Sequence, residues 1–265
     1  MDPFEAFKKE QKERFAKFAP MEMLTMGAAT FLVKHARVQA GQRVLDVACG
    51  TGVVAVTAGR LGARVAGLDL TPELLERARE NSTIAAVDID WYEGDVENLP
   101  FEDDVFDVVV SQFGHMFAPR PEVAIKEMLR VLKRGGTIAF STWPPELFMG
   151  RMFALSGRYA PPPPSGVAPT NLWGDPNVVR DRLGEMVKDI VFDRQSIQTA
   201  ALSPQHYRDT VERASGALVK LVESLGKTDP GKLAAFRGEF EALIAEYFND
   251  NGVRQSFLMT RAVKI

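Results

Sequence analysis

Residues 44–52 read Val-Leu-Asp-Val-Ala-Cys-Gly-Thr-Gly and carry the pattern that decides the fold. An apolar strand runs straight into a glycine turn, and a helix is predicted over Val53–Leu61. Gly50 and Gly52 permit a tight turn and a close approach of a ligand to the backbone, while the helix N-terminus offers free N–H groups to a negative group. With Ala55 the spacing also satisfies the G-x-G-x-x-A form of a dinucleotide site, which alone is weak evidence.

On both sides of this segment, short β-rich runs alternate with helical ones. Strands are predicted at 43–47, 64–68, 89–92, 106–111 and 137–142, with helices at 53–61, 72–81 and 122–132. Thr71 is the predicted N-cap of the second helix, since Pro72 follows it. Nearly all-apolar strands such as Val105–Val110 belong in the middle of a parallel sheet that helices cover on both faces. Residues 43–142 therefore predict a doubly wound α/β unit.

The flanking segments predict additions to this unit. Two helices are expected at 3–17 and 21–35, a helix at 176–186, strands at 190–199 and 253–263, and helical stretches at 204–225 and 230–248. Pro161–Pro164 indicates a loop, either a lid or a plain connector. We therefore predict N-terminal helices over the active site (1–40), a core (41–143, 176–200 and 253–265), a lid loop (144–175) and a helical insertion that forms a cap (201–252).

Composition excludes several classes of protein. The chain has 265 residues, 46% hydrophobic and 25% charged, and a net charge of −3, so neither disorder nor a nucleic-acid partner is favoured. The single cysteine, Cys49, cannot form an internal disulfide, and no apolar run approaches the ~18–20 residues of a membrane span. We expect a soluble cytoplasmic protein. The sequence is compatible with a homodimer but does not determine the oligomeric state.

Three acidic residues lie at or just after the ends of the first three predicted strands. Asp46 ends the first, Asp69 ends the second, and Asp95 comes just after the third. Because ligands of open parallel sheets bind outside the carboxyl ends of the strands, these side chains should converge on one rim. Such a rim repels a pyrophosphate but suits a cationic head, ribose hydroxyls and an exocyclic amine. S-adenosylmethionine has all three, and its carboxylate can use the helix N-terminus.

Four motifs occur in order between residues 40 and 143: VLDVACGTG, GLDLTPELLERAR, GDVENLPFEDDVFDVVVSQFG and EMLRVLKRGGTIAFSTW. Together they resemble the class I S-adenosylmethionine-dependent methyltransferases, most of all the small-molecule branch around the ubiquinone/menaquinone C-methyltransferases. The resemblance implies a Rossmann-like, doubly wound sheet of seven strands in the order 3-2-1-4-5-7-6, with the last strand antiparallel. Residues 253–263 fit that last strand.

The resemblance also implies the cofactor-binding residues. Asp46 and the backbone of Ala48, Cys49, Gly50, Thr51 and Gly52 would hold the methionine moiety. Asp69 would hold the ribose hydroxyls and Leu70 would pack on the adenine. The adenine edge would meet Asp95 and Val96, and the floor of the site would be formed by Ser111 and Gln112.

Methyl transfer from a sulfonium is an in-line displacement with an activated leaving group, so alignment matters more than catalytic residues. His115 follows the fourth strand and is the best candidate for a general base, although a histidine that only shapes the pocket wall is an equal alternative. No metal cluster is apparent. The acceptor cavity is expected near a group of Met and Phe residues: Met21, Met23, Met26, Phe148, Met149, Met152 and Phe153. A cavity lined by such residues favours an apolar or aromatic small molecule, but residues of these types fit an ordinary hydrophobic core equally well.

Ser111-Gln112-Phe113-Gly114 stands where methyltransferases of adenine, cytosine or glutamine carry an Asn-Pro-Pro-Tyr-type sequence, which argues against those acceptors. Two other functions remain open. A nicotinamide-dependent oxidoreductase fits the glycine spacing loosely, but Asp46 and Asp95 count against it. A non-catalytic, S-adenosylmethionine-binding regulatory protein would keep the same motifs, and only transfer of a labelled methyl group distinguishes it from an enzyme.

Overall fold

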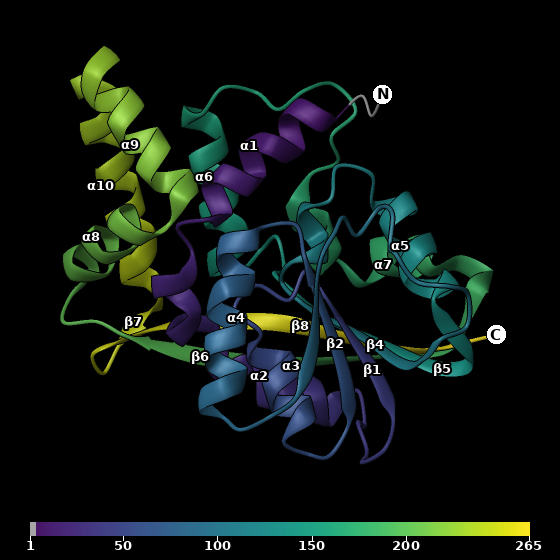
Figure 1. The fold of residues 1–265 in the computed structure, drawn as a ribbon. Helices are drawn as coiled ribbons and strands as arrows, with labels where there is room; N and C mark the ends of the chain where they lie inside the picture. Colours follow the sequence, from purple (N-terminus) through teal and green to yellow (C-terminus); the bar gives the residue numbers. More distant parts are fainter. Residues whose placement is uncertain (1–3) are drawn as a thin grey trace.

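One sheet runs through the computed structural model, which describes residues 4–265 (Figure 1). The strands lie in the order β3-β2-β1-β4-β5-β8-β6, and a two-residue strand, β7, pairs with β8. Their bounds are β1 Arg43–Val47, β2 Arg64–Asp69, β3 Ile89–Glu93, β4 Phe106–Gln112, β5 Leu132–Thr142, β6 Val187–Ala200, β7 Phe248–Asn249 and β8 Gly252–Lys264. β1 to β5 pair in parallel, and β8 is antiparallel to both β5 and β6. The predicted strand order is confirmed, with β8 as the predicted last strand.

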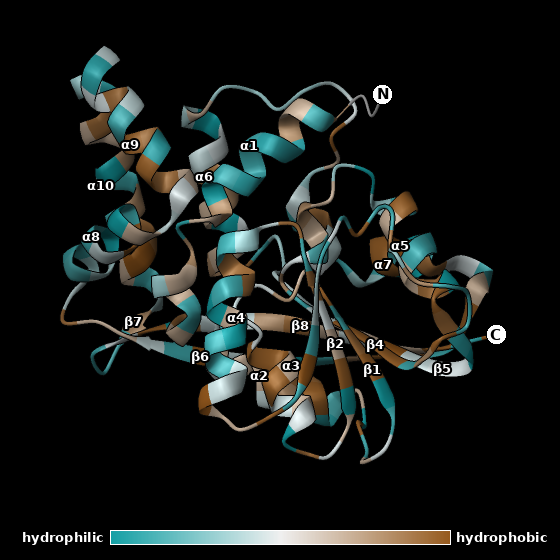
Figure 2. Cartoon of the chain, viewed as in Figure 1, coloured by the Kyte–Doolittle hydropathy of each residue, from teal (hydrophilic) through white to brown (hydrophobic). Residues whose placement is uncertain are grey.

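Helices cover both faces of the sheet because its central strands are apolar on both sides. Val44, Val108 and Val110 pack against α2 (Glu22–His35) and α3 (Val53–Gly59). Leu45 and Val109, the alternate residues of the same strands, pack against α5 (Pro121–Arg130) and α7 (Pro176–Leu183). Helix α4 (Pro72–Ile84) lies beside α3. Figure 2 shows these central strands largely in the hydrophobic colour.

A second apolar core lies beside the sheet, among α6 (Phe148–Tyr159), α8 (Pro204–Ala214), α9 (Gly216–Thr228) and α10 (Pro230–Tyr247). These four helices, which we call the cap, gather at one end of the molecule in Figure 1. Strands β6 and β8 extend beyond the rest of the sheet toward this core. Strand β8 pairs with β5 only over Leu258–Val263, whereas its pairing with β6 begins at Gly252. Among the helices of residues 4–265, none is long and apolar enough to cross a bilayer.

Two expectations differ from the structure in this region. The predicted loop 144–175 contains α6, because Phe148, Met152 and Leu155 form an apolar stripe at helical spacing that is buried in the cap. The predicted helix 204–225 is interrupted at Ser215. There α9 begins at Gly216, where a Cβ atom would collide with the backbone of Arg14, so the break brings two distant segments into close contact.

Helix α1 (Glu5–Phe15) lies above the ends of the strands and contacts α9 (Figure 1). It is mostly hydrophilic in Figure 2, yet Lys8 is buried. The first three residues of the segment expected to form N-terminal helices lie outside the described residues. Helix α1 and the turn at Ala19–Met21 lie over the carboxyl ends of the strands and line the cavity described next.

Candidate active site

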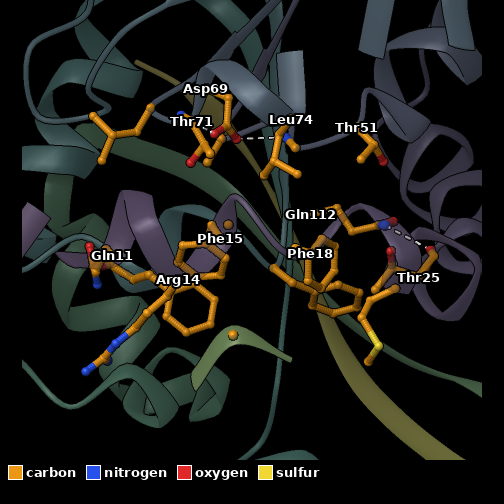
Figure 3. Close-up of a pocket in the computed structure, with 18 of the residues that line it drawn as sticks. Gln11, Arg14, Phe15, Phe18, Thr25, Thr51, Asp69, Thr71, Leu74 and Gln112 are labelled. Atoms are coloured by element: carbon orange, nitrogen blue, oxygen red, sulfur yellow. Dashed lines mark hydrogen bonds between the residues drawn. The ribbon is translucent and has the colours of Figure 1, made fainter. Parts of the chain in front are cut away.

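A cavity of about 310 Å³ opens between the carboxyl ends of the strands, α1 and the cap. Its wall is formed by residues from nearly the whole length of the chain, from Lys8 to Gln255. In Figure 3, Asp69, Thr71 and Leu74 lie on one side of this space, and Phe15 and Phe18 lie on the other. Asp69 and Thr71 therefore face the cavity from the sheet side, and the rings of Phe15 and Phe18 face it from the N-terminal segment.

Asp46 is the most buried acid of the cavity, with 1% of its surface exposed. The backbone N–H of Ala55, in α3, donates to Oδ2 at 3.0 Å. The other carboxyl oxygen, Oδ1, is buried and receives no hydrogen bond from the described residues. Burial raises the pKa of Asp46 to about 8, and the nearby Asp69 adds to the shift. The side chain therefore holds a buried acceptor that a donor from outside the protein can satisfy.

Asp69 organises the turns that surround it. Its Oδ2 accepts from the N–H of Gly50 at 2.8 Å, and its Oδ1 accepts from the N–H of Thr71 at 2.8 Å. Burial raises the pKa of Asp69, and the two amides oppose that shift. Thr71 is the N-cap residue of α4 as predicted, but its side chain makes no capping bond. Because Asp69 bonds both amides, it fixes the glycine turn relative to the start of α4.

Asp95 sits at the mouth of the cavity and is already engaged by α1. Lys8 Nζ lies 2.6 Å from Asp95 Oδ2 and 2.6 Å from Glu97 Oε2. Asp95 Oδ1 accepts from the N–H of Glu97 at 2.9 Å. Sequence reasoning did not find Lys8, because a lysine in a polar helix normally faces solvent. The structure shows that this lysine ties α1 to the loop after β3.

The glycine turn uses the backbone freedom predicted for Gly50 and Gly52, and Ala48 shares it without having been predicted to. Ala48, Gly50 and Gly52 all have positive φ angles. Gly52 does not line the cavity; a Cβ there would collide with the ring of Trp91, so this glycine serves packing. Burial raises the pKa of the Cys49 thiol well above its usual range, and the charges of Asp46 and Asp69 add to this effect. The thiol therefore stays protonated and is a poor nucleophile.

The end of β4 contributes one residue to the cavity and one to its support. Gln112 lines the cavity; its Nε2 donates to the carbonyl oxygen of Thr25 at 3.0 Å, and its Oε1 is buried without a partner among the described residues (Figure 3). Ser111 does not line it. The hydroxyl of Ser111 donates to the carbonyl oxygen of Val47 at 2.7 Å and accepts from the N–H of His115 at 3.2 Å. Ser111 therefore joins β1 to the turn after β4.

His115 does not reach the cavity, so the structure does not support its predicted role as a general base. Its ring is fully buried, 4.7 Å from the rings of Phe140 and Trp173, and neither ring nitrogen has a hydrogen-bond partner among the described residues. Burial lowers the pKa of His115 to about 3, and the charge of Arg182 adds to the shift. Its surroundings match the alternative role, a histidine that shapes the wall behind the site.

The predicted cofactor-binding residues mostly converge on the cavity. All of them line it except Gly52 and Ser111: Asp46, Ala48, Cys49, Gly50, Thr51, Asp69, Leu70, Asp95, Val96 and Gln112. Thr51 is further fixed by Asn81 of α4, whose Nδ2 donates to its carbonyl oxygen at 2.9 Å. Within residues 4–265, no group of three or more His, Cys, Asp or Glu side chains is arranged to hold a metal ion.

The expected Met and Phe group divides into two sets. Met21, Met149, Met152 and Phe153 line the cavity. Met23 and Met26 are 79% and 46% exposed, because they lie on the outer side of α2, and Phe148 is part of the core of the cap. Sequence reasoning missed the polar residues of the cavity wall that come from distant elements, namely Gln11, Arg14, Tyr207 and Gln255. No local motif marks them.

The sheet order and the acid-lined cavity at the strand ends define a Rossmann-like methyltransferase fold. A family model described as "Methyltransferase domain" matches residues 45–140. The fold is shared with phosphoethanolamine N-methyltransferase 2 of Haemonchus contortus, solved in complex with S-adenosyl-L-methionine. That likeness has a TM-score of 0.53 at 17% identity and covers 90% of this chain and 52% of that one.

Sequence relatives place the chain more closely. "Uncharacterized protein Rv1403c" of Mycobacterium tuberculosis is 34% identical over 244 residues, which are 92% of this chain and 89% of that protein. Demethylmenaquinone methyltransferase of Staphylococcus aureus is 36% identical over 137 residues, which are 49% of this chain and 56% of that protein. The chain belongs to the class I S-adenosylmethionine-dependent methyltransferases, in one family with the mycobacterial protein, and it resembles the menaquinone C-methyltransferases.

Proposed function

We propose that this protein transfers a methyl group from S-adenosylmethionine to a small apolar or aromatic metabolite. Asp46 carries the proposal, because its Oδ1 is a buried acceptor without a partner among the described residues, inside a cavity at the strand ends. An unpaired buried acceptor is costly, and the ammonium of the amino acid head is a donor that removes this cost. The pKa of about 8 means that a cation there would also ionise the carboxyl.

The other residues of the polar wall would hold the remainder of the cofactor. Asp69 already accepts from two backbone amides and keeps further lone pairs for ribose hydroxyls. Asp95 and Val96 lie at the adenine end of the proposed site, and Leu70 would pack on the ring. Bound here, S-adenosylmethionine would supply a methyl group on a sulfonium, a leaving group that needs no proton from the protein.

The acceptor would occupy the apolar part of the cavity, between α1 and the cap. Phe15, Phe18, Met152 and Phe153 line the cavity and would exclude water from this part once the acceptor is bound. We propose that the helical insertion at residues 201–252, which supplies three of the four helices of the cap, closes this end together with the N-terminal helices. Without His115 at the cavity, alignment and a dry site would account for the rate more than a general base would.

Two measurements test the proposal. Calorimetric titration should detect S-adenosylhomocysteine binding and no NAD binding, because a pyrophosphate would meet Asp46 and Asp69. Incubation of the enzyme with trideuteromethyl-labelled S-adenosylmethionine and a metabolite extract should then give products that are 17 mass units heavier than their precursors, since CD3 replaces a hydrogen.

The two results separate the remaining alternatives. Binding of S-adenosylhomocysteine without any labelled product, across extracts that cover apolar metabolites, would favour the regulatory protein. Preferential binding of NAD would instead refute the cofactor assignment. The matched control is Asp90→Asn, an exposed acid of β3 outside the cavity, which should bind S-adenosylhomocysteine like the wild type.

A further inference from the structure

Two buried polar side chains face the apolar part of the cavity and have no role in the cofactor site. Tyr207, in α8, and Gln255, in β8, each expose 3% of their surface, and both line the cavity. Tyr207 packs in an apolar cluster, several other residues of which also line the cavity: Met21, Leu24, Met149, Met152, Val211 and Leu218. Gln255 lies on the part of β8 that pairs only with β6, beyond the last pair with β5, so both residues belong to the cap end.

A third residue holds the pair in place. Gln255 Nε2 donates to Thr199 Oγ1 of β6 at 2.8 Å and to the hydroxyl oxygen of Tyr207 at 3.0 Å. Both amide hydrogens of Gln255 are therefore used. Its Oε1 accepts from none of the described residues, and the hydroxyl proton of Tyr207 has no acceptor among them. The pair thus keeps one acceptor and one donor for a ligand.

The unused donor of Tyr207 and the unused acceptor of Gln255 determine which ligand group fits best. A hydroxyl group accepts from Tyr207 and donates to Gln255, so it satisfies both side chains at once. A carbonyl oxygen would use only the donor, and a hydrocarbon would use neither. In a buried apolar wall each unmet group costs binding free energy, so the wall discriminates among these ligands. Burial also raises the pKa of Tyr207, which keeps its phenol neutral and able to donate.

We propose that Tyr207 and Gln255 bind a hydroxyl group of the methyl acceptor, which makes the acceptor a hydroxylated apolar molecule. This inference rests on the proposed function, because it assigns the apolar part of the same cavity to the acceptor. Tyr207 and Gln255 are specificity residues: they hold the acceptor by a hydroxyl group at the cap end, and the cofactor acids lie at the strand ends.

The test uses two aromatic probes that differ by one hydroxyl group. The full-length protein is first saturated with S-adenosylhomocysteine, and 2-naphthol and naphthalene are then titrated by their own fluorescence. The wild type should bind 2-naphthol about tenfold more tightly than naphthalene, a ratio in the range of one to two buried hydrogen bonds. Tyr207→Phe and Gln255→Met should each bring the ratio of the two dissociation constants near one without changing affinity for naphthalene.

Tyr159→Phe is the matched control. It also removes a phenol hydroxyl from a cap helix, but that hydroxyl donates to the exposed Glu239 at 2.6 Å and lies outside the cavity wall. This variant should keep the wild-type ratio. The proposal is overturned if the wild type does not prefer 2-naphthol, if neither probe binds, or if Tyr207→Phe and Gln255→Met both retain the preference. Because S-adenosylhomocysteine binding is measured separately in every variant, failure of the hydroxyl site is distinguishable from failure of the cofactor site.

Discussion

Raising the pH from 6 to 8 should strengthen binding of S-adenosylhomocysteine about 50-fold, through the ionisation of Asp46. This ligand keeps the amino acid head of the methyl donor. With a pKa of about 8, the Asp46 carboxyl is roughly 1% ionised at pH 6 and roughly half ionised at pH 8. If the ammonium binds only to the ionised form, the apparent association constant is proportional to the ionised fraction. The 50-fold change in that fraction corresponds to about 2.3 kcal/mol of binding free energy.

Isothermal titration calorimetry measures both parts of this prediction. Dissociation constants at pH 6, 7 and 8 give the slope, and an upper limit of pH 8 keeps the ligand's amino group protonated. Titrations at pH 7 in phosphate and in Tris, whose ionisation enthalpies differ, give the number of protons released, which should be about 0.9 because roughly that fraction of Asp46 is protonated. An affinity that changes less than twofold from pH 6 to 8 would refute the reasoning.

The variant Asp46→Asn is the control, since it keeps the shape of the side chain and the acceptor for Ala55. It should bind more weakly, and the proton release and the pH slope should disappear. If they persist, another buried acid titrates, and Asp69 is the first candidate. In the protein without ligand, folding stability depends on pH in the opposite direction to ligand affinity. The pKa of Asp46 is higher in the folded state than its ordinary value, so the free energy of unfolding falls as the pH rises toward 8, by about 1.4 kcal/mol per pH unit. Asp46→Asn should therefore melt higher than the wild type at pH 8.

Three further substitutions test separate parts of the site. Asp69→Ala should weaken binding of S-adenosylhomocysteine by roughly 1–3 kcal/mol in calorimetry, since charge-assisted hydrogen bonds are lost, and unchanged affinity would contradict its role. Lys8→Met removes the ion pairs to Asp95 and Glu97 at 2.6 Å, so it should destabilise the docking of α1 by roughly 1–3 kcal/mol. Chymotrypsin should then cleave after Phe15 faster than in the wild type. An unchanged cleavage rate would show that other contacts hold the helix. His115→Leu should raise the melting temperature, since two unpaired buried nitrogens disappear, and leave turnover unchanged; a rate loss of roughly 10²-fold or more would restore the general base.

The acid-lined part of the cavity, where we propose that the cofactor binds, could be predicted from sequence because its signals are local. Each acid stands within two or three residues of a strand end, and the glycines follow directly in the chain, so strand–turn–helix spacing alone brings Asp46, Asp69 and Asp95 to one rim. The exceptions show the limit of that reasoning. Gly52 has the expected positive φ angle, yet it makes room for Trp91, a residue some forty positions away.

His115 shows a second limit of the sequence. Its position after β4 correctly placed it close to the cavity in the chain, but the direction of its side chain depends on Trp173 and Phe140, which pack against the imidazole. The loop expected at 144–175 was wrong over α6 for a related reason. Its apolar stripe acquires a partner only when α8 and α10 return to it later in the chain.

The apolar part of the cavity, which is the proposed acceptor site, depends on contacts between the two ends of the chain. The break between α8 and α9 has no explanation until Arg14 is placed against Gly216, and Lys220 of α9 pairs with Glu13 of α1 at 3.3 Å. The packing of α1 against α9 also places Tyr207 and Gln255 in the same cavity as Lys8. A strand-end acid can be recognised from the residues beside it in the sequence. The proposed role of Tyr207 depends instead on Gln255, whose amide donates to the phenol oxygen and leaves the phenol proton without an acceptor among the described residues. The three acids of the proposed methyl-donor site can therefore be found from local sequence, whereas the proposed acceptor site can be recognised only in the folded cap.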